Sequence, residues 1–388
     1  MTRIPERALR ILIPFAALLA SGCGGAGTTA VGDPPGGGIG GTGSVAVVAQ
    51  GPITALGSVV VDGIEFETSA STRIIREGAE ASEADLRVGM VVQVSGTFDP
   101  AAPPTALGYT PGVAEQVVYT GEVEGPVSVD PATGGISVLG RPVVISPATR
   151  LEGIASADGL ADGDVIEVSG LVGPDGRILA TYVELTCRAG ECGPGDPAVD
   201  LRGPVEGLDL QAGRFRIHGQ GVRFDDATEI LTDLAEGAQV RVRGWLAPDG
   251  GVLAGLIEPG GTDLPEGLHA EVEGIVGTVW PADLRFTVAG IEVDAAGASF
   301  EGGTFGDLRP GLRVEVEGTV AAGRLAAREV EIKGGGMEEH DGIGTGDDGD
   351  MGPESGTEME APEGPDGQGD DGMEPVMETG EPGEAHSD

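Results

Sequence analysis

Three arginines in the second half of the chain are the side chains best placed for ligand chemistry. Arg214 and Arg216 alternate with Phe215 and Ile217, so both arginines are expected to point to the solvent side of one strand. Arg223 follows on the next predicted strand. This grouping makes the three arginines a candidate patch for an anion or a glycan. The alternative is that they pair with Asp or Glu on neighbouring strands, which is common in an acidic protein.

The acidic C-terminal segment offers two kinds of metal ligand. Asp347, Asp348, Asp350 and Glu354 are hard oxygen ligands of the kind that Ca²⁺ prefers, but their spacing does not match the D-x-[DN]-x-[DN]-G loop. Thioether and imidazole groups select copper, but here they are irregularly spaced among an excess of carboxylates. We therefore expect no formed metal site, and ion binding by this segment stays an alternative function. The thioether and imidazole groups are Met337, Met351, Met359, Met373, Met377, His340 and His386.

The sequence carries no motif for a known catalytic mechanism. His218 and His269 are the two histidines outside the acidic segment, and neither lies in a nucleophile or metal motif. No G-x-S-x-G motif or phosphate loop is present. Three Cys and four His are too few for a Cys/His metal array. We therefore expect a protein that is not an enzyme and carries no cofactor.

The charge of the chain excludes one class of partner. The net charge is −42, and residues 334–388 hold 18 acidic residues and no basic residue. A surface of this sign repels phosphates, so nucleic acid is not an expected partner. Residues 334–388 also lack hydrophobic periodicity, which predicts a disordered acidic tail.

The N-terminus has the pattern of an export signal. Residues 1–22 are basic at first and then carry "ILIPFAALLA", which is too short to span a bilayer and is typical of a signal peptide. The following "LLASGC" resembles the lipobox of bacterial lipoproteins, which implies cleavage before Cys23 and lipid attachment to it. The alternative is an ordinary signal peptide with a Cys nearby. Because Gly24 is not Asp, the resemblance favours the outer membrane of the bacterial cell envelope. Residues 23–50 are predicted to be a Gly-rich tether.

The other two cysteines stand close together in "CRAGEC". In an oxidising envelope compartment, two spare thiols usually pair. We therefore expect a local disulfide between Cys187 and Cys192. The alternatives are a redox pair, which is normally spaced C-x-x-C, and a metal site, for which no further ligands stand nearby.

One sequence motif, Leu-x-x-Gly-x-x-[Val/Ile]-x-Val-x-Gly, occurs four times at a constant spacing of 74 residues. Apolar and polar positions alternate in it, which predicts a strand with one face buried and the other in water. The leading Leu is expected to fill the core from a short helix or turn. The apolar columns are Val92, Ile166, Val240 and Val314, then Val94, Val168, Val242 and Val316; Gln93, Glu167, Arg241 and Glu315 lie between them.

Each repeat reads as three strands, a connector with the Leu, and two further strands. This order predicts an all-β protein of four tandem small OB-like barrel modules, with a disordered N-terminal linker and an acidic C-terminal tail. The predicted modules are residues 51–119, 120–186, 201–260 and 261–333, with a Cys-containing linker at 187–200.

The first repeat resembles a known bacterial family. The opening "GPITALG", the hairpin "VVVDGIEF" and the closing "DLRVGMVVQVSG" are similar to the family called domain of unknown function 5666. The resemblance is looser in the other three repeats and covers residues 51–333 in all. It implies tandem β modules on an exported protein, and it supplies no catalytic residues.

These features predict a non-enzymatic lipoprotein of the cell envelope. Its modules are expected to bind or scaffold, with an envelope protein or a glycan as the partner and a lipid anchor in the membrane. The first alternative is a metal- or ion-binding envelope protein that acts through the tail. The second alternative is a hydrolase whose active site lies within the modules.

Overall fold

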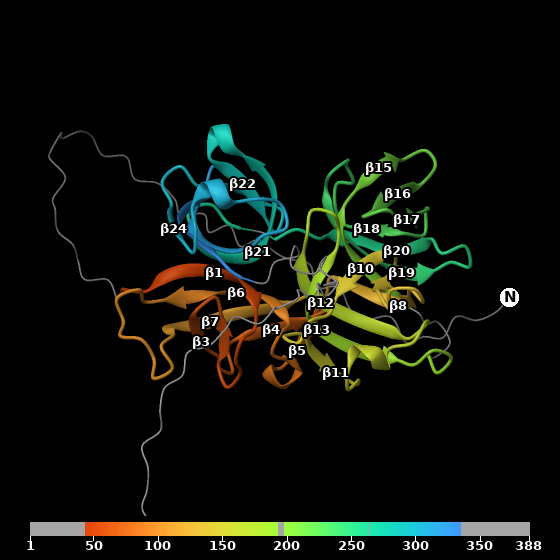
Figure 1. Cartoon of the computed structure of the whole chain (residues 1–388), viewed down its shortest axis with the longest axis horizontal. Helices are drawn as coiled ribbons and strands as arrows, with labels where there is room; N and C mark the ends of the chain where they lie inside the picture. The colour runs from red at the N-terminus through yellow and green to blue at the C-terminus, as the bar shows by residue number, and fades with distance from the viewer. Residues whose placement is uncertain (1–42, 193–197, 263, 335–388) are drawn as a thin grey trace, which may run out of the picture. The chain divides into compact units, whose positions relative to one another are not determined.

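The computed structural model describes residues 43–192, 198–262 and 264–334, and within them the chain is all β (Figure 1). Four copies of one unit follow each other, as the sequence predicts. The tether before residue 43, the acidic tail and Cys23 lie outside the described residues. Among the described residues, no helix has the length and apolar character needed to cross a membrane.

The repeats share one order of strands, although repeat 1 alone has two short strands before its connector. Each of the expected five strands is present, and a short extra strand lies before the connector, because residues there pair alongside the last strand of the repeat. Repeat 1 contains β1 (Val45–Pro52), β2 (Val59–Val61), β3 (Ile64–Glu67), β4 (Arg73–Arg76), β5 (Ala79–Ala81), the 3-10 helix η1 (Glu83–Asp85), β6 (Val91–Phe98) and β7 (Thr110–Tyr119). Repeat 2 contains β8 (Val123–Val129), β9 (Ile136–Val138), β10 (Arg141–Val144), β11 (Arg150–Glu152), η2 (Ala157–Gly159), β12 (Val165–Val172) and β13 (Ile178–Cys187).

The last two repeats differ in small ways. Repeat 3 has no 3-10 helix before its Leu, and repeat 4 gains one after its first strand. Repeat 3 contains β14 (Ala198–Pro204), β15 (Glu206–Asp209), β16 (Arg214–Ile217), β17 (Gln220–Arg223), β18 (Glu229–Ile230), β19 (Gln239–Leu246) and β20 (Val252–Pro259). Repeat 4 contains β21 (His269–Trp280), η3 (Pro281–Asp283), β22 (Arg285–Val288), β23 (Ile291–Asp294), β24 (Ser299–Glu301), η4 (Phe305–Asp307), β25 (Arg313–Ala321) and β26 (Arg324–Ile332).

The strands of a repeat close into a small barrel. In repeat 2 the pairs run β8–β9–β10–β13–β12 and back to β8, and only the β10–β13 pair in this circuit is parallel. Repeat 4 closes in the same order, from β21 through β22, β23, β26 and β25. A five-stranded barrel of this order is OB-like, which confirms the predicted fold class.

The repeated sequence motif supplies core residues to each barrel. All eight residues of the two apolar columns are at most 1% exposed. The leading Leu follows a 3-10 helix in three repeats, where Leu86, Leu160 and Leu308 are buried. Leu234 of repeat 3 is only partly buried. The Leu of the connector is therefore buried as expected in three repeats and only partly buried in repeat 3.

The two glycines of this motif are required for different structural reasons. Gly311 has a φ of 94°, a left-handed conformation that favours Gly over residues with a Cβ. Gly318 lies at a β-bulge between β25 and β26, where a Cβ would stand 2.3 Å from the carbonyl oxygen of Ala326. The same holds in the other three repeats. The first glycine has a left-handed φ, and a Cβ at the second glycine would stand 2.0–2.3 Å from a carbonyl oxygen of the partner strand.

Strand pairing also joins separate repeats. β1 pairs in parallel with β21, from Val47 opposite His269 to Gln50 opposite Val272, so repeats 1 and 4 share one sheet. β8 pairs with β14, so repeats 2 and 3 share the other sheet. Because β1 begins at Val45, the end of the predicted tether belongs to the first barrel. Likewise, β14 begins at Ala198, inside the predicted linker.

The polar positions of the repeated strand do not all face water, so that expectation is wrong. Glu167 is 8% exposed and Arg241 is 4% exposed, while Gln93 and Glu315 are half-buried. Side chains of other repeats cover them: Arg76 contacts Glu167, and Glu77 contacts Arg241. The outer faces of these strands are therefore contacts between barrels.

Candidate functional site

An acidic stripe crosses the outer face of repeat 4 where repeat 1 meets it. His269, Glu271 and Glu273 alternate along β21, so their side chains share one face of the strand. On β25, Glu317 lies directly opposite Glu271, and Glu315 lies opposite Glu273. Like charges in directly opposed positions repel each other, so the stripe requires counter-ions.

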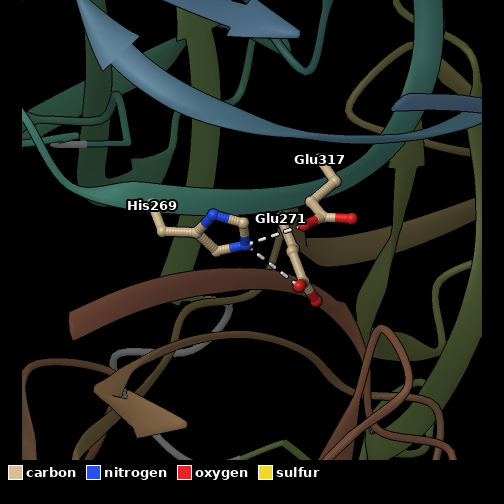
Figure 2. Close-up of side chains that lie close together, drawn as sticks. All are labelled: His269, Glu271 and Glu317. Atoms are coloured by element: carbon tan, nitrogen blue, oxygen red, sulfur yellow. Dashed lines mark hydrogen bonds and ion pairs between the residues drawn. The ribbon is translucent and has the colours of Figure 1, made fainter. Parts of the chain in front are cut away.

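The imidazole of His269 serves one half of this stripe. Figure 2 shows its Nε2 between two carboxylates, 3.2 Å from Oε1 of Glu271 and 3.3 Å from Oε1 of Glu317. Its ring also packs on Phe98 of repeat 1, with ring centroids 5.0 Å apart. Burial raises the pKa of the Glu271 carboxyl, while the contact with His269 acts in the other direction. These three side chains are close enough to hold a metal ion, but Nε2 is already engaged by both carboxylates.

The other half of the stripe gathers three carboxylates from two repeats. Asp62, in the turn between β2 and β3, lies beside Glu273 and Glu315, and their ligand oxygens are all within 4.8 Å of one another. Arg313 donates to Glu273, and the Lys333 amine lies 2.8 Å from Glu315. Burial first, and then the charges of Glu315 and Glu273, raise the pKa of Asp62 well above its ordinary value. Asp62 and Glu273 are buried and Glu315 is half-buried, so this group of acids is largely shielded from water.

A cavity of about 440 Å³ lies next to this cluster and is lined by all four repeats. Gln50, Leu171, His218 and Glu273 each come from a different repeat. Ligand sites in proteins usually measure about 300–1,000 Å³ and combine apolar walls with a few polar groups. The cavity is therefore large enough for a small polar molecule.

Charged side chains form ion pairs between the repeats. Arg241 of repeat 3 contacts Glu77 of repeat 1, and its Nε lies 2.9 Å from both carboxylate oxygens of Asp200. Burial, with the charge of Arg243, lowers the pKa of Arg241 to about 10. Arg76 of repeat 1 similarly reaches Glu184 of repeat 2 at 2.6 Å. Arg76 and Glu184 are partly exposed, whereas Arg241 is buried, so loss of Arg241 would leave an uncompensated charge at Asp200.

A family profile matches four separate stretches of the chain, at residues 50–107, 120–184, 202–258 and 273–331. The profile is that of the domain of unknown function DUF5666, and together the matches cover more than half of the chain. The chain belongs to this family. A search of curated proteins finds no match.

The arginine patch predicted on the third DUF5666 repeat is largely paired with acids. Arg223 makes a two-pronged contact with Asp249, with both distances 2.8 Å, and Arg214 lies 3.5 Å from Asp209. Arg216 lies on the same exposed face of β16 as Arg214, and Glu206 of β15 lies opposite it. The three side chains are thus close together, but acids offset most of their charge.

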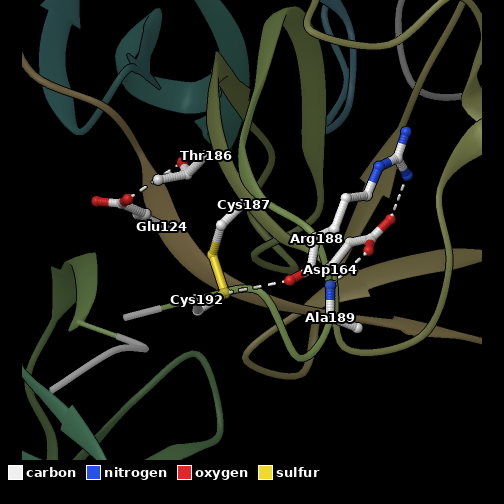
Figure 3. The surroundings of a disulfide bond; sticks show 7 residues. All are labelled: Glu124, Asp164, Thr186, Cys187, Arg188, Ala189 and Cys192. Carbon is white, nitrogen blue, oxygen red and sulfur yellow. Dashed lines mark hydrogen bonds and ion pairs between the residues drawn. A yellow bond between two sulfur atoms is a disulfide. The ribbon is translucent and has the colours of Figure 1, made fainter. Parts of the chain in front are cut away.

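The two cysteines between the second and third DUF5666 repeats form a disulfide, with Cα atoms 5.5 Å apart (Figure 3). The short loop that they close contacts the body of repeat 2. Arg188 lies 2.7 Å from buried Asp164, whose other oxygen accepts a hydrogen bond from the Ala189 amide at 2.9 Å. The disulfide therefore closes a short loop after β13, and Asp164 holds this loop against the barrel of repeat 2.

Sequence reasoning missed the acidic stripe of the fourth DUF5666 repeat. The alternation of His269, Glu271 and Glu273 is visible in "HAEVEG" and predicts one polar face of a strand. Nothing in the sequence places Asp62 beside that face, because the contact spans more than 200 residues. The hairpin turn of repeat 1 carries this Asp where the other repeats have Leu139, His218 and Ala289.

Proposed function

We propose that this protein is a non-enzymatic lipoprotein of the bacterial cell envelope, anchored through Cys23 in the outer membrane. Its four DUF5666 barrels form a joined scaffold that binds an envelope protein or a glycan. The observation that carries the proposal is the pairing of strands between repeats, at β1–β21 and β8–β14. Barrels joined in this way keep a fixed spacing, whereas barrels on flexible linkers would not.

The chemistry of the contacts between repeats supports a scaffold. Glu167 and Arg241, which a strand in an isolated barrel would present to solvent, are used to bind neighbouring repeats. A Leu171, Leu179 and Ile275 cluster adds apolar contact between repeats 2 and 4. These surfaces are buried in contacts between repeats. A partner would therefore bind at the cavity or on the exposed outer strands.

The cavity supports binding in addition to spacing. Arg202 and Glu122 lie 3.2 Å apart on its wall, near Gln239, His218 and Thr278. Such a lining offers both donors and acceptors, which suits the hydroxyl groups of a glycan. The described residues show no exposed run of aromatic side chains, so stacking on sugar rings is not part of the proposal.

Lipid attachment is tested by labelling. The full chain, expressed in a bacterium with an outer membrane and fed a labelled fatty acid, should carry the label and fractionate with that membrane. Cys23→Ser should lose both properties. Label that persists in Cys23→Ser, or its absence from the unsubstituted chain, would remove the anchor from the proposal.

Binding by the barrels is tested by thermal melting with neutral and anionic glycans. A ligand at a hundred times its Kd should stabilise the chain by about 2.7 kcal/mol. Thr278→Trp should abolish the shift by filling the cavity mouth, and Ser128→Trp, on an exposed strand position away from it, should not. A shift that is indifferent to Thr278→Trp would place the ligand elsewhere. No shift with any glycan leaves a protein partner, which cross-linking in cells would identify.

The same screen separates the scaffold from the ion-binding alternative. A chain that ends at Lys333 lacks the acidic segment and its methionines and histidines. If the barrels bind the partner, the shortened chain keeps the activity. Copper or Ca²⁺ binding that is lost entirely with residues 334–388 would favour the alternative.

A further inference from the structure

The Asp62 carboxylate has no hydrogen-bond partner for either of its oxygens among the described residues. Its side chain is buried, with only 8% of the residue exposed. A buried carboxylate without a partner is costly, and proteins normally satisfy such groups with a donor, a proton or a metal ion. Asp62 therefore requires a proton or a metal ion as its ligand, because the described side chains donate no hydrogen bond to it.

The surroundings of Asp62 favour a cation as that ligand. Its oxygens point toward Glu273 and Glu315, and the three ligand oxygens are within 4.8 Å of one another. Arg313 and Lys333 neutralise part of this charge. Glu271 and Glu331 add to it from the neighbouring strand positions. Five carboxylates thus surround two cationic side chains, which leaves an excess of negative charge around the buried Asp62.

We propose that Asp62, Glu273 and Glu315 bind a Ca²⁺ ion that clamps the first repeat to the fourth. The spacing fits: Ca²⁺–oxygen distances are about 2.3–2.6 Å, so two oxygens on one ion are at most about 5 Å apart. The ligands are all hard oxygens, and waters reaching Glu273 from the adjoining cavity would complete the six to eight positions that Ca²⁺ takes.

The neighbouring His269 group does not carry the same inference. Its three ligand atoms are equally close, but the histidine nitrogen already lies within 3.3 Å of both carboxylates. Mg²⁺ fits the Asp62 group less well, because it demands near-ideal octahedral geometry at about 2.0–2.1 Å. Zn²⁺ prefers nitrogen and sulfur ligands, which the Asp62 group lacks.

Gly51 fixes where the Asp62 side chain lies. A Cβ at Gly51 would stand 2.3 Å from Oδ1 of Asp62, so the carboxylate rests directly on the backbone of β1. Asp62 has a φ of 48° and is followed by Gly63 at 75°, the pattern of a tight hairpin turn. The β1–β21 pairing then brings this turn to Glu273. One ion at this point would touch both sides of the contact between repeats 1 and 4.

The test is thermal melting of the full chain after treatment with a chelator, with and without added Ca²⁺. The unsubstituted chain should gain at least about 3 °C in Tm, and Mg²⁺ at the same concentration should give a smaller gain. Asp62→Asn keeps the shape and the left-handed turn, and should not respond to Ca²⁺. Its Tm without metal should exceed that of the unsubstituted chain, because the cost of burying a carboxyl group beside Glu273 and Glu315 is removed.

Two further variants serve as controls for this experiment. Asp226→Asn removes one exposed acid elsewhere and should respond to Ca²⁺ like the unsubstituted chain. Glu315→Gln should lose the response even if Asp62→Asn fails to fold. An equal Ca²⁺ response in Asp62→Asn, or no response in the unsubstituted chain, would overturn the proposal. Neither result bears on the scaffold, whose tests use the glycan screen and the anchor.

Discussion

Single side chains decide how the barrels are held together, and Arg241 is the clearest case. Arg241→Ala would leave Asp200 and Glu77 without their partner in a buried contact. We expect the free energy of unfolding to fall by about 3–5 kcal/mol, measured by denaturant titration. Arg214→Ala, which removes an exposed ion pair, should cost at most about 1 kcal/mol. Similar losses in the two variants would contradict a structural role for the buried contact.

His218 gives the protein a pH dependence of predictable sign. Burial, with the charge of Arg141, lowers the pKa of its imidazole to about 4. The unfolded chain takes up this proton near the ordinary value of about 6.5, before the folded chain does. Acidification from about pH 6.5 to 4 should therefore favour unfolding, whereas above pH 6.5 this effect vanishes.

The comparison that isolates this effect uses His218→Asn, since Asn tolerates the left-handed φ of 46° at this turn. All other titrating groups are shared by the two proteins. Between pH 7 and pH 4, the unsubstituted chain should lose about 1–2 kcal/mol more than the variant, after allowance for solvent screening of the half-buried ring. Parallel stability curves over this range would show that His218 titrates at the same pH in both states.

At the scale of elements, the bulge glycine of each repeat is the sharpest constraint. In Gly318→Ala the new Cβ would stand 2.3 Å from the Ala326 carbonyl oxygen, so β25 or β26 must shift. We expect a loss of about 1–3 kcal/mol in the free energy of unfolding. Gly297→Ala has open space and no left-handed φ, and should change it by less than about 1 kcal/mol. Equal effects would mean that the bulge is not sterically tight.

The barrel strands were predictable because the alternation of apolar and polar residues, seen in every repeat, directly reflects which side chains are buried. The columns through Val92 and Val94 identify the core-facing side of the central strand in every copy. The exposure of the polar positions on the same strand was not predictable in this way. Whether Glu167 faces water depends on Arg76, which lies in another repeat. The Asp62 cluster was out of reach for the same reason. Its members become neighbours only when β1 pairs with β21.

At the scale of the whole molecule, the shared sheet should transmit damage between repeats that are far apart in the sequence. Gly318, Ala270 and Val48 occupy one row across β25, β21 and β1. Hydrogen exchange in Gly318→Ala should therefore rise in β21, β25 and β26, and also in β1 of repeat 1. It should not rise in β14 to β20 of repeat 3. Unchanged protection of Val45–Pro52 would show that repeats 1 and 4 open independently.

The β1–β21 pairing also limits how this chain can change in length. Arrays of stacked repeats usually have two open ends and can gain or lose units by tandem duplication. Here both long edges of β1 are occupied, by β6 on one side and β21 on the other, so repeat 1 offers no vacant strand to an added copy. A fifth unit could therefore pair with β1 only by displacing β6 or β21. Duplication of a repeat would thus have to extend the array from another sheet edge, such as β24, and would leave the contact between repeats 1 and 4 in place.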